Sequence, residues 1–313
     1  MSQQPTPRRV LITGASGFIG YHTIAPLLQS GFEVVAGYNR RKPPEVTGVT
    51  WVQADLLDET GIKSLVQAAK ASHLLHCAWY VEPGKMIGDV LNFHWVRHSL
   101  ELIHHFHESG GTRCVIAGSC YEYDWRYGYC HELLTPAVAN TFYGNAKNSL
   151  REAFTGYCRA TGLSGAWGRA FFLYGPRENP QRLVSSLAKA LLSGKEAPSS
   201  HGEQIRDYLH VQDVGDALAA LVTSSASGVY NFGSGRATTL RNIIETVGRI
   251  AGKSELLRIG ALPARANDAP LVVADIERIR TDVGWQPRIG LEQGLASTVE
   301  WWRRELNAQT GRA

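Results

Sequence analysis

The fold is decided by a glycine-rich stretch, Thr13-Gly14-Ala15-Ser16-Gly17-Phe18-Ile19-Gly20. This stretch follows a short apolar run, 10–13, and opens a longer amphipathic segment, 17–29. A dinucleotide-binding turn requires this strand-before, helix-after context. Gly14 allows the tight turn, Gly17 lets the backbone approach a pyrophosphate, and Gly20 lets the helix pack closely on the strand. The N–H groups that begin the helix then bind the anion. The stretch therefore predicts a nucleotide-binding unit rather than an ordinary glycine turn.

The rest of the first half alternates short apolar runs with amphipathic segments. Apolar runs that lack clear alternation, separated by helices, are typical of a parallel sheet covered on both faces. This order predicts an α/β fold of the Rossmann type, a doubly wound parallel sheet, over residues 1–172. The expected strands are 10–13, 33–38, 50–53, 73–77, 112–117 and 164–171, and the expected helices are 17–29, 58–70, 92–108 and 141–161. Pro26 lies inside the first of these helices and is expected to kink it.

The regular alternation stops after residue 174. A smaller C-terminal α/β domain that binds the substrate is predicted over 173–313, and segments near 204–235 are expected to return to the large domain. Its expected helices are 181–193, 211–224, 239–251, 275–283 and 291–304, and its expected strands are 204–209 and 229–232.

Composition excludes several classes of protein. The formal net charge is +4 over 313 residues without a basic arm, so no nucleic acid is expected as a partner. No apolar run is long enough to span a bilayer, and the polar first nine residues lack a signal core, so a cytoplasmic protein is expected. The five cysteines are odd in number and form no C-x-x-C pair, which predicts reduced thiols rather than disulfides or a zinc site.

The glycine spacing is G-x-x-G-x-x-G, and TGASGFIG resembles the fingerprint of the extended short-chain dehydrogenases/reductases, the NAD-dependent epimerase/dehydratase family. The resemblance extends from about residue 10 to 302. It places Asp55 at the family's adenine-contacting aspartate, His76-Cys77-Ala78 at the loop beside the cofactor, and Asn92 at the helix asparagine. The implied cofactor-binding residues are Gly14, Ser16, Gly17, Phe18, Ile19, Gly20, Asn39, Arg40, Arg41, Asp55, Leu56, Cys77, Ala78, Tyr143 and Lys147.

The end of the second strand indicates which nicotinamide cofactor is bound. NAD-binding folds carry an acidic residue there for the ribose hydroxyls. Here Asn39-Arg40-Arg41-Lys42 follows the strand without a carboxylate. An arginine pairs with a 2′-phosphate bidentately, whereas a carboxylate would repel it. The sequence therefore favours NADP(H) over NAD(H), with a solvated basic loop as the alternative.

Tyr143-Gly144-Asn145-Ala146-Lys147 places a phenol and an ammonium one helical turn apart. A tyrosine ionises near pH 10, and a neighbouring ammonium lowers that pKa toward the working range. In the family, a serine after the fifth strand donates a hydrogen bond to the substrate oxygen, and Ser119 matches it because Tyr123 follows four residues later. The resemblance therefore implies a catalytic set of Ser119, Tyr143 and Lys147.

The longest family-like stretch, 202–214, resembles the segment G-x-x-x-R-D-[YF]-x-H-V-x-D-V of the nucleotide-sugar domain. By resemblance, Arg206 pairs with the substrate diphosphate, and Arg265, in a segment similar to R-P-G-D, does the same. His210 and Asp213 are expected to order the loop and cap the next helix. The resemblance implies a nucleotide-sugar substrate bound by Ser119, Cys120, Tyr121, Arg182, Arg206 and Arg265. The aromatic loop 121–129 is expected either to line the substrate entrance or to pack as an ordinary surface loop.

Two departures from the family pattern narrow the reaction. Dehydratases carry Asp-Glu directly after the catalytic serine, whereas Cys120 and Tyr121 stand there, and Glu122 on an extended segment would face the other way. Many epimerases have an asparagine where Phe172 stands. We therefore expect an NADPH-dependent 4-ketoreductase of an NDP-4-keto-6-deoxyhexose, an enzyme of deoxysugar biosynthesis. The alternative is an NDP-sugar 4-epimerase with tightly bound NAD. A small-carbonyl reductase and a non-enzymatic cofactor-sensing regulator are less favoured.

The histidine-rich segment 104–107, with His94 and His98, suggests a metal site, but a plain helix surface is the favoured interpretation and no metal is expected. Relatives often dimerise through the helices near Asn92 and Tyr143, so the resemblance also implies a homodimer.

Overall fold

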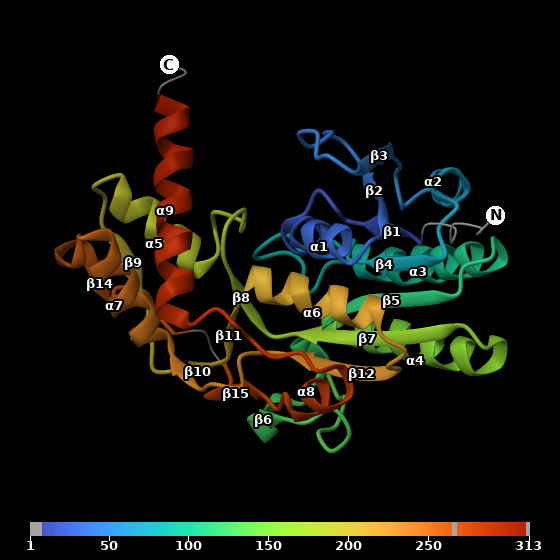
Figure 1. The fold of residues 1–313 in the computed structure, drawn as a ribbon. Coiled ribbons are helices and arrows are strands. Elements are labelled where there is room, and N and C mark those ends of the chain that lie inside the picture. The colour runs from blue at the N-terminus through green and yellow to red at the C-terminus, as the bar shows by residue number, and fades with distance from the viewer. Residues whose placement is uncertain (1–7, 265–267, 311–313) are drawn as a thin grey trace.

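The computed structural model describes residues 8–264 and 268–310. Its centre is a parallel sheet of seven strands, which confirms the predicted Rossmann-type α/β fold (Figure 1). The strand order is β12-β7-β5-β4-β1-β2-β3. The bounds are β1 Arg9–Thr13, β2 Glu33–Tyr38, β3 Val49–Gln53, β4 His73–His76, β5 Arg113–Ser119, β7 Ser164–Ala170 and β12 Gly228–Phe232. The chain reverses direction across the sheet between β1 and β4, which is where such sheets bind ligands.

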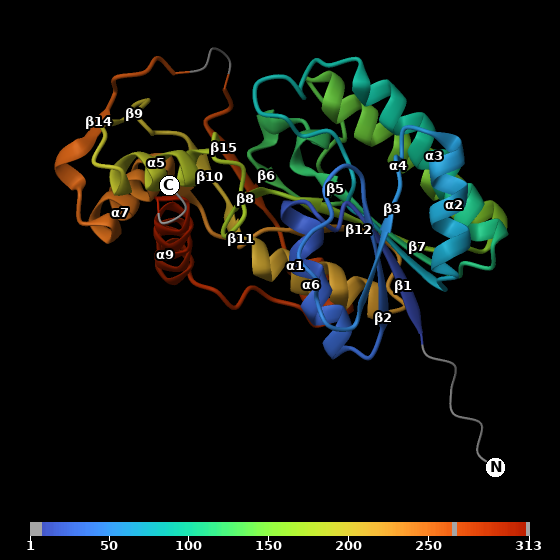
Figure 2. The same ribbon diagram turned by 90° about the horizontal axis from the view of Figure 1, so that it is seen from above.

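Helices cover both faces of this sheet, as Figure 2 shows. One face carries α1, Phe18–Gln29, and α6, Val211–Thr223. The other carries α2, Glu59–Ala69, α3, Leu91–Glu108, and α4, Phe142–Thr161. Each face has its own fully buried apolar cluster. Because the strands are buried on both sides, they are apolar without alternation, as the sequence indicated.

Helix α1 includes Pro26 in its last turn. The proline removes the N–H that would bond the carbonyl of His22. That carbonyl instead meets α6, where a Cβ at Gly215 would lie 2.2 Å from its oxygen. The Gln212 side-chain amide also donates to it at 3.5 Å. The Gln212 amide thus partly replaces the N–H that the proline removes, which is the physical reason that the proline is tolerated.

The C-terminal part packs around a third apolar cluster that α5, Leu183–Leu192, α7, Leu240–Ala251, and α9, Leu291–Thr310, share (Figure 1). Short strands lie outside the large sheet. They are β6 Tyr129–Cys130, β8 Phe172–Tyr174, β9 Ala197–Ser199, β10 Ile205–Arg206, β11 Tyr208–His210, β13 Thr238–Thr239, β14 Leu257–Ile259 and β15 Leu271–Ala274, and they are accompanied by α8 Glu277–Val283. Strands β13, β10, β15 and β6 form a second sheet, and β8 pairs with β11. The expected strand 164–171 matches β7 to within one residue, and β8 follows as a separate strand that was not expected, because the chain leaves the large sheet after Ala170.

Over residues 8–264 and 268–310, no helix is both long enough and apolar enough to cross a membrane.

Candidate active site

The glycine turn lies at the carboxyl end of β1, against the loop that follows β4. Gly14 has φ of +68°, and a Cβ there would lie 2.7 Å from the backbone nitrogen of Ala78. A Cβ on Gly20 would lie 2.3 Å from the carbonyl oxygen of Gly14. Both positions therefore require glycine. Gly17 begins α1 without a side-chain cap, and no acidic residue stands in the first turn. The free N–H groups of Phe18, Ile19 and Gly20 form a site suited to a phosphate.

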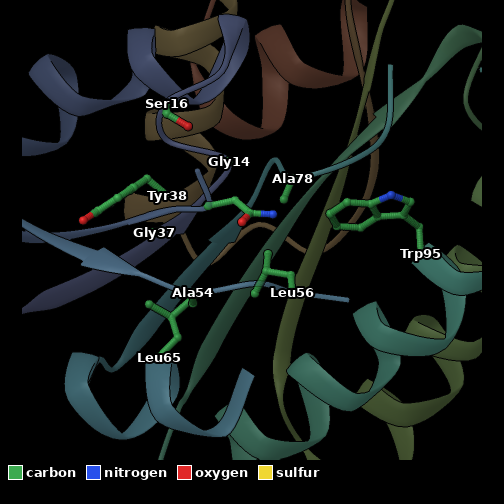
Figure 3. A pocket seen from close by; sticks show the side chains of 10 residues that line it. Gly14, Ser16, Gly37, Tyr38, Ala54, Leu56, Leu65, Ala78 and Trp95 are labelled. Carbon is green, nitrogen blue, oxygen red and sulfur yellow. The ribbon is translucent and has the colours of Figure 1, made fainter. Parts of the chain in front are cut away.

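A small hollow of about 100 Å³ lies beside this turn (Figure 3). It is bordered by β2 and by the segment after β3, and its walls are mostly apolar. An apolar-walled hollow next to a phosphate-binding helix end suits the adenosine part of a dinucleotide. The chain thus fits the dinucleotide that the sequence implies. The lining residues are Gly14, Ser16, Gly37, Tyr38, Asn39, Ala54, Leu56, Leu65, Ala78 and Trp95.

The residues expected at the adenosine ribose follow β2. Asn39, Arg40 and Arg41 are exposed, and in the described part of the chain neither arginine has an ion pair or side-chain hydrogen bond. Lys42 instead pairs with Glu45. Asp55 is exposed, and its carboxylate accepts the N–H of Leu57 at 3.0 Å, so it orders the turn before α2.

Ser119 and Tyr143 come together at the carboxyl end of β5. Ser119 is the last residue of β5, and its hydroxyl faces the phenol of Tyr143 on α4 closely enough to influence its ionisation. Tyr143 is 6 % exposed. Burial raises the pKa of its phenol well above the usual range, contrary to the lowering by Lys147 that the sequence suggested, while Ser119 acts in the opposite direction. The phenol is therefore protonated at neutral pH and can donate a proton.

Lys147 lies one turn further along α4 and is 3 % exposed. Its Nζ donates to the carbonyl of Ala117 at 2.9 Å and lies 3.8 Å from the centre of the Trp79 ring. Burial lowers the pKa of Lys147 to about 8. Trp79, which immediately follows the expected loop Cys77–Ala78, is a residue that sequence reasoning missed.

Glu122 stands in a short 3-10 helix, Cys120–Glu122, and not on the extended segment expected from the sequence. The chain turns there because Ser119 and Glu122 form a capping box, in which the Glu122 carboxylate accepts the Ser119 N–H at 2.7 Å. The carboxylate also accepts from Trp167 Nε1 at 3.0 Å and from Arg169 Nε at 2.7 Å. Glu122 is fully buried, so it holds the strand end in place and is not presented to a ligand.

Aromatic rings line the approach to Tyr143. Tyr121 lies 5.7 Å from the Tyr143 ring and 4.6 Å from Trp125, and Trp125 lies 6.0 Å from Phe172. Of the two open interpretations of this loop, an aromatic wall next to Tyr143 fits these contacts. Cys120 differs, because its side chain is buried in an apolar cluster behind this wall.

Two arginines expected to bind the substrate, Arg206 at the diphosphate and Arg182, both lie near Tyr208. They act on its phenol in the same direction, lowering a pKa that burial raises. Arg206 is 3 % exposed, donates to Asp268 at 2.6 Å and lies 5.3 Å from the Phe172 ring. Arg182 precedes α5 and contacts the sulfur of Met86. Tyr208 was not singled out from the sequence. The predicted substrate residue Arg265 lies outside the described residues.

His210 and Asp213 have structural contacts. His210 is the N-cap of α6, accepting the N–H of Gln212 at 3.2 Å. Asp213 accepts the N–H groups of Arg288 and Ile289, which fixes the segment before α9. Within the described ranges, no group of three or more His, Cys, Asp or Glu side chains is arranged to hold a metal ion, the histidines of α3 included.

A glycine turn at the carboxyl edge of a doubly wound sheet, with a Ser-Tyr-Lys cluster beside it, defines a Rossmann-type enzyme of the extended short-chain dehydrogenase/reductase class. The model of the NAD dependent epimerase/dehydratase family matches residues 10–233, and the chain belongs to this family.

Known proteins resemble the chain over nearly its whole length. It is 24 % identical to a UDP-glucose 4-epimerase of Bacillus subtilis (strain 168), over 95 % of this chain and 98 % of that protein. It is 26 % identical to a dTDP-glucose 4,6-dehydratase of Actinoplanes, over 94 % and 98 %. The crystal structure of a UDP-glucose 4-epimerase from Thermus thermophilus, in complex with NAD, has a TM-score of 0.86 and 27 % identity, over 94 % of this chain and 99 % of that one.

Proposed function

We propose that the protein is a nucleotide-sugar oxidoreductase, an NADP(H)-dependent 4-ketoreductase of an NDP-4-keto-6-deoxyhexose. The observation that carries this proposal is the contrast between Tyr143 and Glu122. Tyr143 is a protonated phenol that faces Ser119 at the carboxyl end of β5, whereas Glu122, the carboxylate nearest Ser119 in the chain, is bound in a buried ion pair. Reduction of a ketone needs one proton donor. Elimination of water also needs an acid and a base that can reach the sugar.

In this mechanism the sugar carbonyl oxygen accepts hydrogen bonds from Ser119 and Tyr143. A bound nicotinamide would supply the hydride to the carbonyl carbon. Tyr143 donates its phenolic proton to the oxygen, so that an alcohol is formed. The ammonium of Lys147 stabilises the phenolate that remains, because an opposite charge one helical turn away favours the ionised form.

The aromatic walls of the site favour a substrate whose sugar has few hydroxyl groups. Tyr121, Trp125 and Phe172 present aromatic rings where a hydroxyl would find few partners. An unpaired buried hydroxyl costs about 1–3 kcal/mol, so a methyl group at carbon 6 and a carbonyl at carbon 4 suit this wall better than hydroxyls do. Arg182 beside Tyr208 is the proposed partner of the diphosphate, together with Arg206, which would exchange its Asp268 partner for the phosphate.

The reductase is tested with purified protein, NADPH and dTDP-4-keto-6-deoxyglucose, following loss of absorbance at 340 nm. We expect turnover, and we expect Tyr143→Phe to lower kcat by about 10²–10⁴-fold while the Kd for NADPH changes less than about twofold. A Tyr143→Phe enzyme with near-normal kcat would remove Tyr143 from the mechanism.

The second candidate is an NDP-sugar 4-epimerase with tightly bound NAD, which the similarity to UDP-glucose 4-epimerases favours. Purified protein incubated with UDP-glucose and no added cofactor distinguishes the two. Formation of UDP-galactose, seen by proton NMR, together with NAD released on denaturation, would replace the reductase proposal.

The proposed preference for NADP(H) rests on Arg40 and Arg41, which are exposed after β2 beside the nucleotide hollow. A charge-assisted hydrogen bond contributes about 1.5–3 kcal/mol. Replacing both arginines by alanine should therefore raise the Kd for NADPH at least about tenfold and leave that for NADH unchanged. Lys42→Ala is the matched control, because Lys42 pairs with Glu45. Tighter binding of NADH than NADPH by the wild type would contradict the preference.

We further propose a cytoplasmic homodimer built on α3 and α4. Val90, Phe93 and Phe142 expose apolar side chains at the adjacent starts of these helices. Light scattering during size-exclusion chromatography should give twice the chain mass, and a monomer at micromolar concentration would contradict the proposal.

A further inference from the structure

Lys147 is a buried ammonium whose charge is not balanced by an ion pair. Among the residues that the structure describes, no carboxylate oxygen pairs with its Nζ. Glu122 is near enough to influence it electrostatically, but that carboxylate is bound to Arg169. A single carbonyl hydrogen bond, to Ala117, compensates little of the cost of removing an ammonium from water. Another group must therefore help to keep Lys147 charged.

The face of Trp79 is the group in the right place. Lys147 Nζ lies 3.8 Å from the centre of its ring, well inside the range of a cation–π contact. Trp167 is a second aromatic face, at 6.0 Å, the outer limit of that range. Trp79 also lies 6.4 Å from the Tyr143 ring, in an edge-on arrangement. The indole thus contacts both members of the proposed catalytic pair.

The orientation of Trp79 is fixed by its neighbours. Its Nε1 donates to Asn92 Oδ1 at 3.0 Å. Asn92 is fully buried, and its amide donates to the carbonyls of Met86 and Asp89 at 2.6 and 2.9 Å. Trp95 stacks against the indole at 5.9 Å. The ring is therefore held in place before any ligand binds.

We propose that Trp79 is a positioning residue for the reaction, whose indole face keeps the Lys147 ammonium charged beside Tyr143. This proposal rests on the proposed roles of Tyr143 and Lys147. Asn92 has a supporting part, because it fixes the plane of the indole.

The other groups that face Lys147 are consistent with this role. Burial lowers the pKa of Lys147, while Glu122 after β5 and Cys77 after β4 raise it. His76 on β4 has a pKa near 3 and is neutral, and the pKa of Cys77 is raised to about 12, so its thiol is also neutral. Tyr143 is a protonated phenol. A desolvated cation–π contact favours the ammonium by a factor of about 10–30, which corresponds to about one to one and a half pH units.

The first test needs no catalysis. Urea unfolding of the full chain is measured for wild type, Trp79→Met, Lys147→Met and the double variant, at pH 6.5 and pH 10. Methionine keeps apolar volume but removes the aromatic face. These four proteins form a double-mutant cycle, which measures the coupling between Trp79 and Lys147. We expect this coupling to be about tenfold in the unfolding equilibrium constant at pH 6.5 and smaller at pH 10, where Lys147 is neutral. Equal coupling at both pH values, or none, would overturn the proposal.

The second test is the pH profile of kcat. In Trp79→Met the fall in kcat on the alkaline side should move to lower pH by about one unit, with KM for the nucleotide sugar unchanged. In Trp79→Phe, which keeps an aromatic face, the fall in kcat should lie close to its wild-type pH. Trp301→Met, on α9 and far from Lys147, is the matched control. Coupling in the first test with an unmoved pH profile would refute the positioning role. Full activity of Lys147→Met would refute the proposed function itself, whereas the unfolding cycle would still report on the contact.

Discussion

Replacing Glu122 by glutamine tests how the end of β5 is held. The side chain is fully buried and accepts from the Ser119 N–H, from Trp167 and from Arg169 at 2.7–3.0 Å. Glutamine keeps the shape of the side chain but removes its negative charge. Its amide NH₂ group would also face N–H groups that now donate to the carboxylate. The Arg169 guanidinium, with 2 % of its side chain exposed, would then be left without its counter-charge. Breaking a buried pair in this way costs about 3–5 kcal/mol.

The assay is urea unfolding followed by tryptophan fluorescence, with Glu300→Gln as the control. Glu300 pairs with Arg303 on the exposed side of α9, so its loss should cost less than about 1 kcal/mol. Glu122→Gln should lower the free energy of unfolding by at least about 3 kcal/mol, a large part of the 5–15 kcal/mol typical of a folded protein. A loss below about 1 kcal/mol, equal to that of the control, would refute the reasoning.

Three further outcomes are expected. Gly20→Ala places a Cβ 2.3 Å from the Gly14 carbonyl oxygen, so calorimetric affinity for NADPH and NAD should fall at least about tenfold, and unchanged affinity would contradict this. Gly215→Ala places a Cβ 2.2 Å from the His22 carbonyl oxygen between α1 and α6, and should lower the free energy of unfolding by about 1–3 kcal/mol in urea. Burial raises the pKa of Glu178 to about 7, so the folded chain keeps this proton while the unfolded chain releases it, and stability falls as pH rises from about 4.5 to 7. Relative to wild type, the free energy of unfolding of Glu178→Gln should therefore gain about 3 kcal/mol between pH 4.5 and 8. If the free energies of the two proteins change with pH in parallel, Glu178 is ionised in the fold and the prediction is wrong.

The large sheet and its helices were predictable because their signals are long. Runs such as 33–38 and 141–161 match β2 and α4 to within one residue. The short strands β6, β9, β13, β14 and β15 were not predicted, because two to four residues carry no periodicity and their pairing depends on distant partners. The packing of the His22 carbonyl against α6 was also unpredictable, since it involves Gly215, which is nearly two hundred residues away from Pro26.

The candidate site likewise contains residues that local patterns indicate and residues that only the fold brings together. The glycine turn and the Tyr143–Lys147 pair have local patterns, so the sequence indicated them. Trp79 is a single aromatic residue after a strand, and only the fold brings its ring over Lys147. The environment of Glu122 was misjudged, because a capping interaction with Ser119 replaces an extended chain by a turn of 3-10 helix.

Strand β12 closes one edge of the large sheet next to β7, although more than fifty residues separate them in the chain. During synthesis on a ribosome, the nucleotide-binding half must wait for residues 211–232 to emerge, because α6 and β12 complete its core and its edge. A nascent chain that stops at residue 172 would leave β7 open to pairing with a neighbouring polypeptide. Production of the isolated N-terminal half should accordingly give aggregates, whereas a longer product that includes β12 has its edge strand in place.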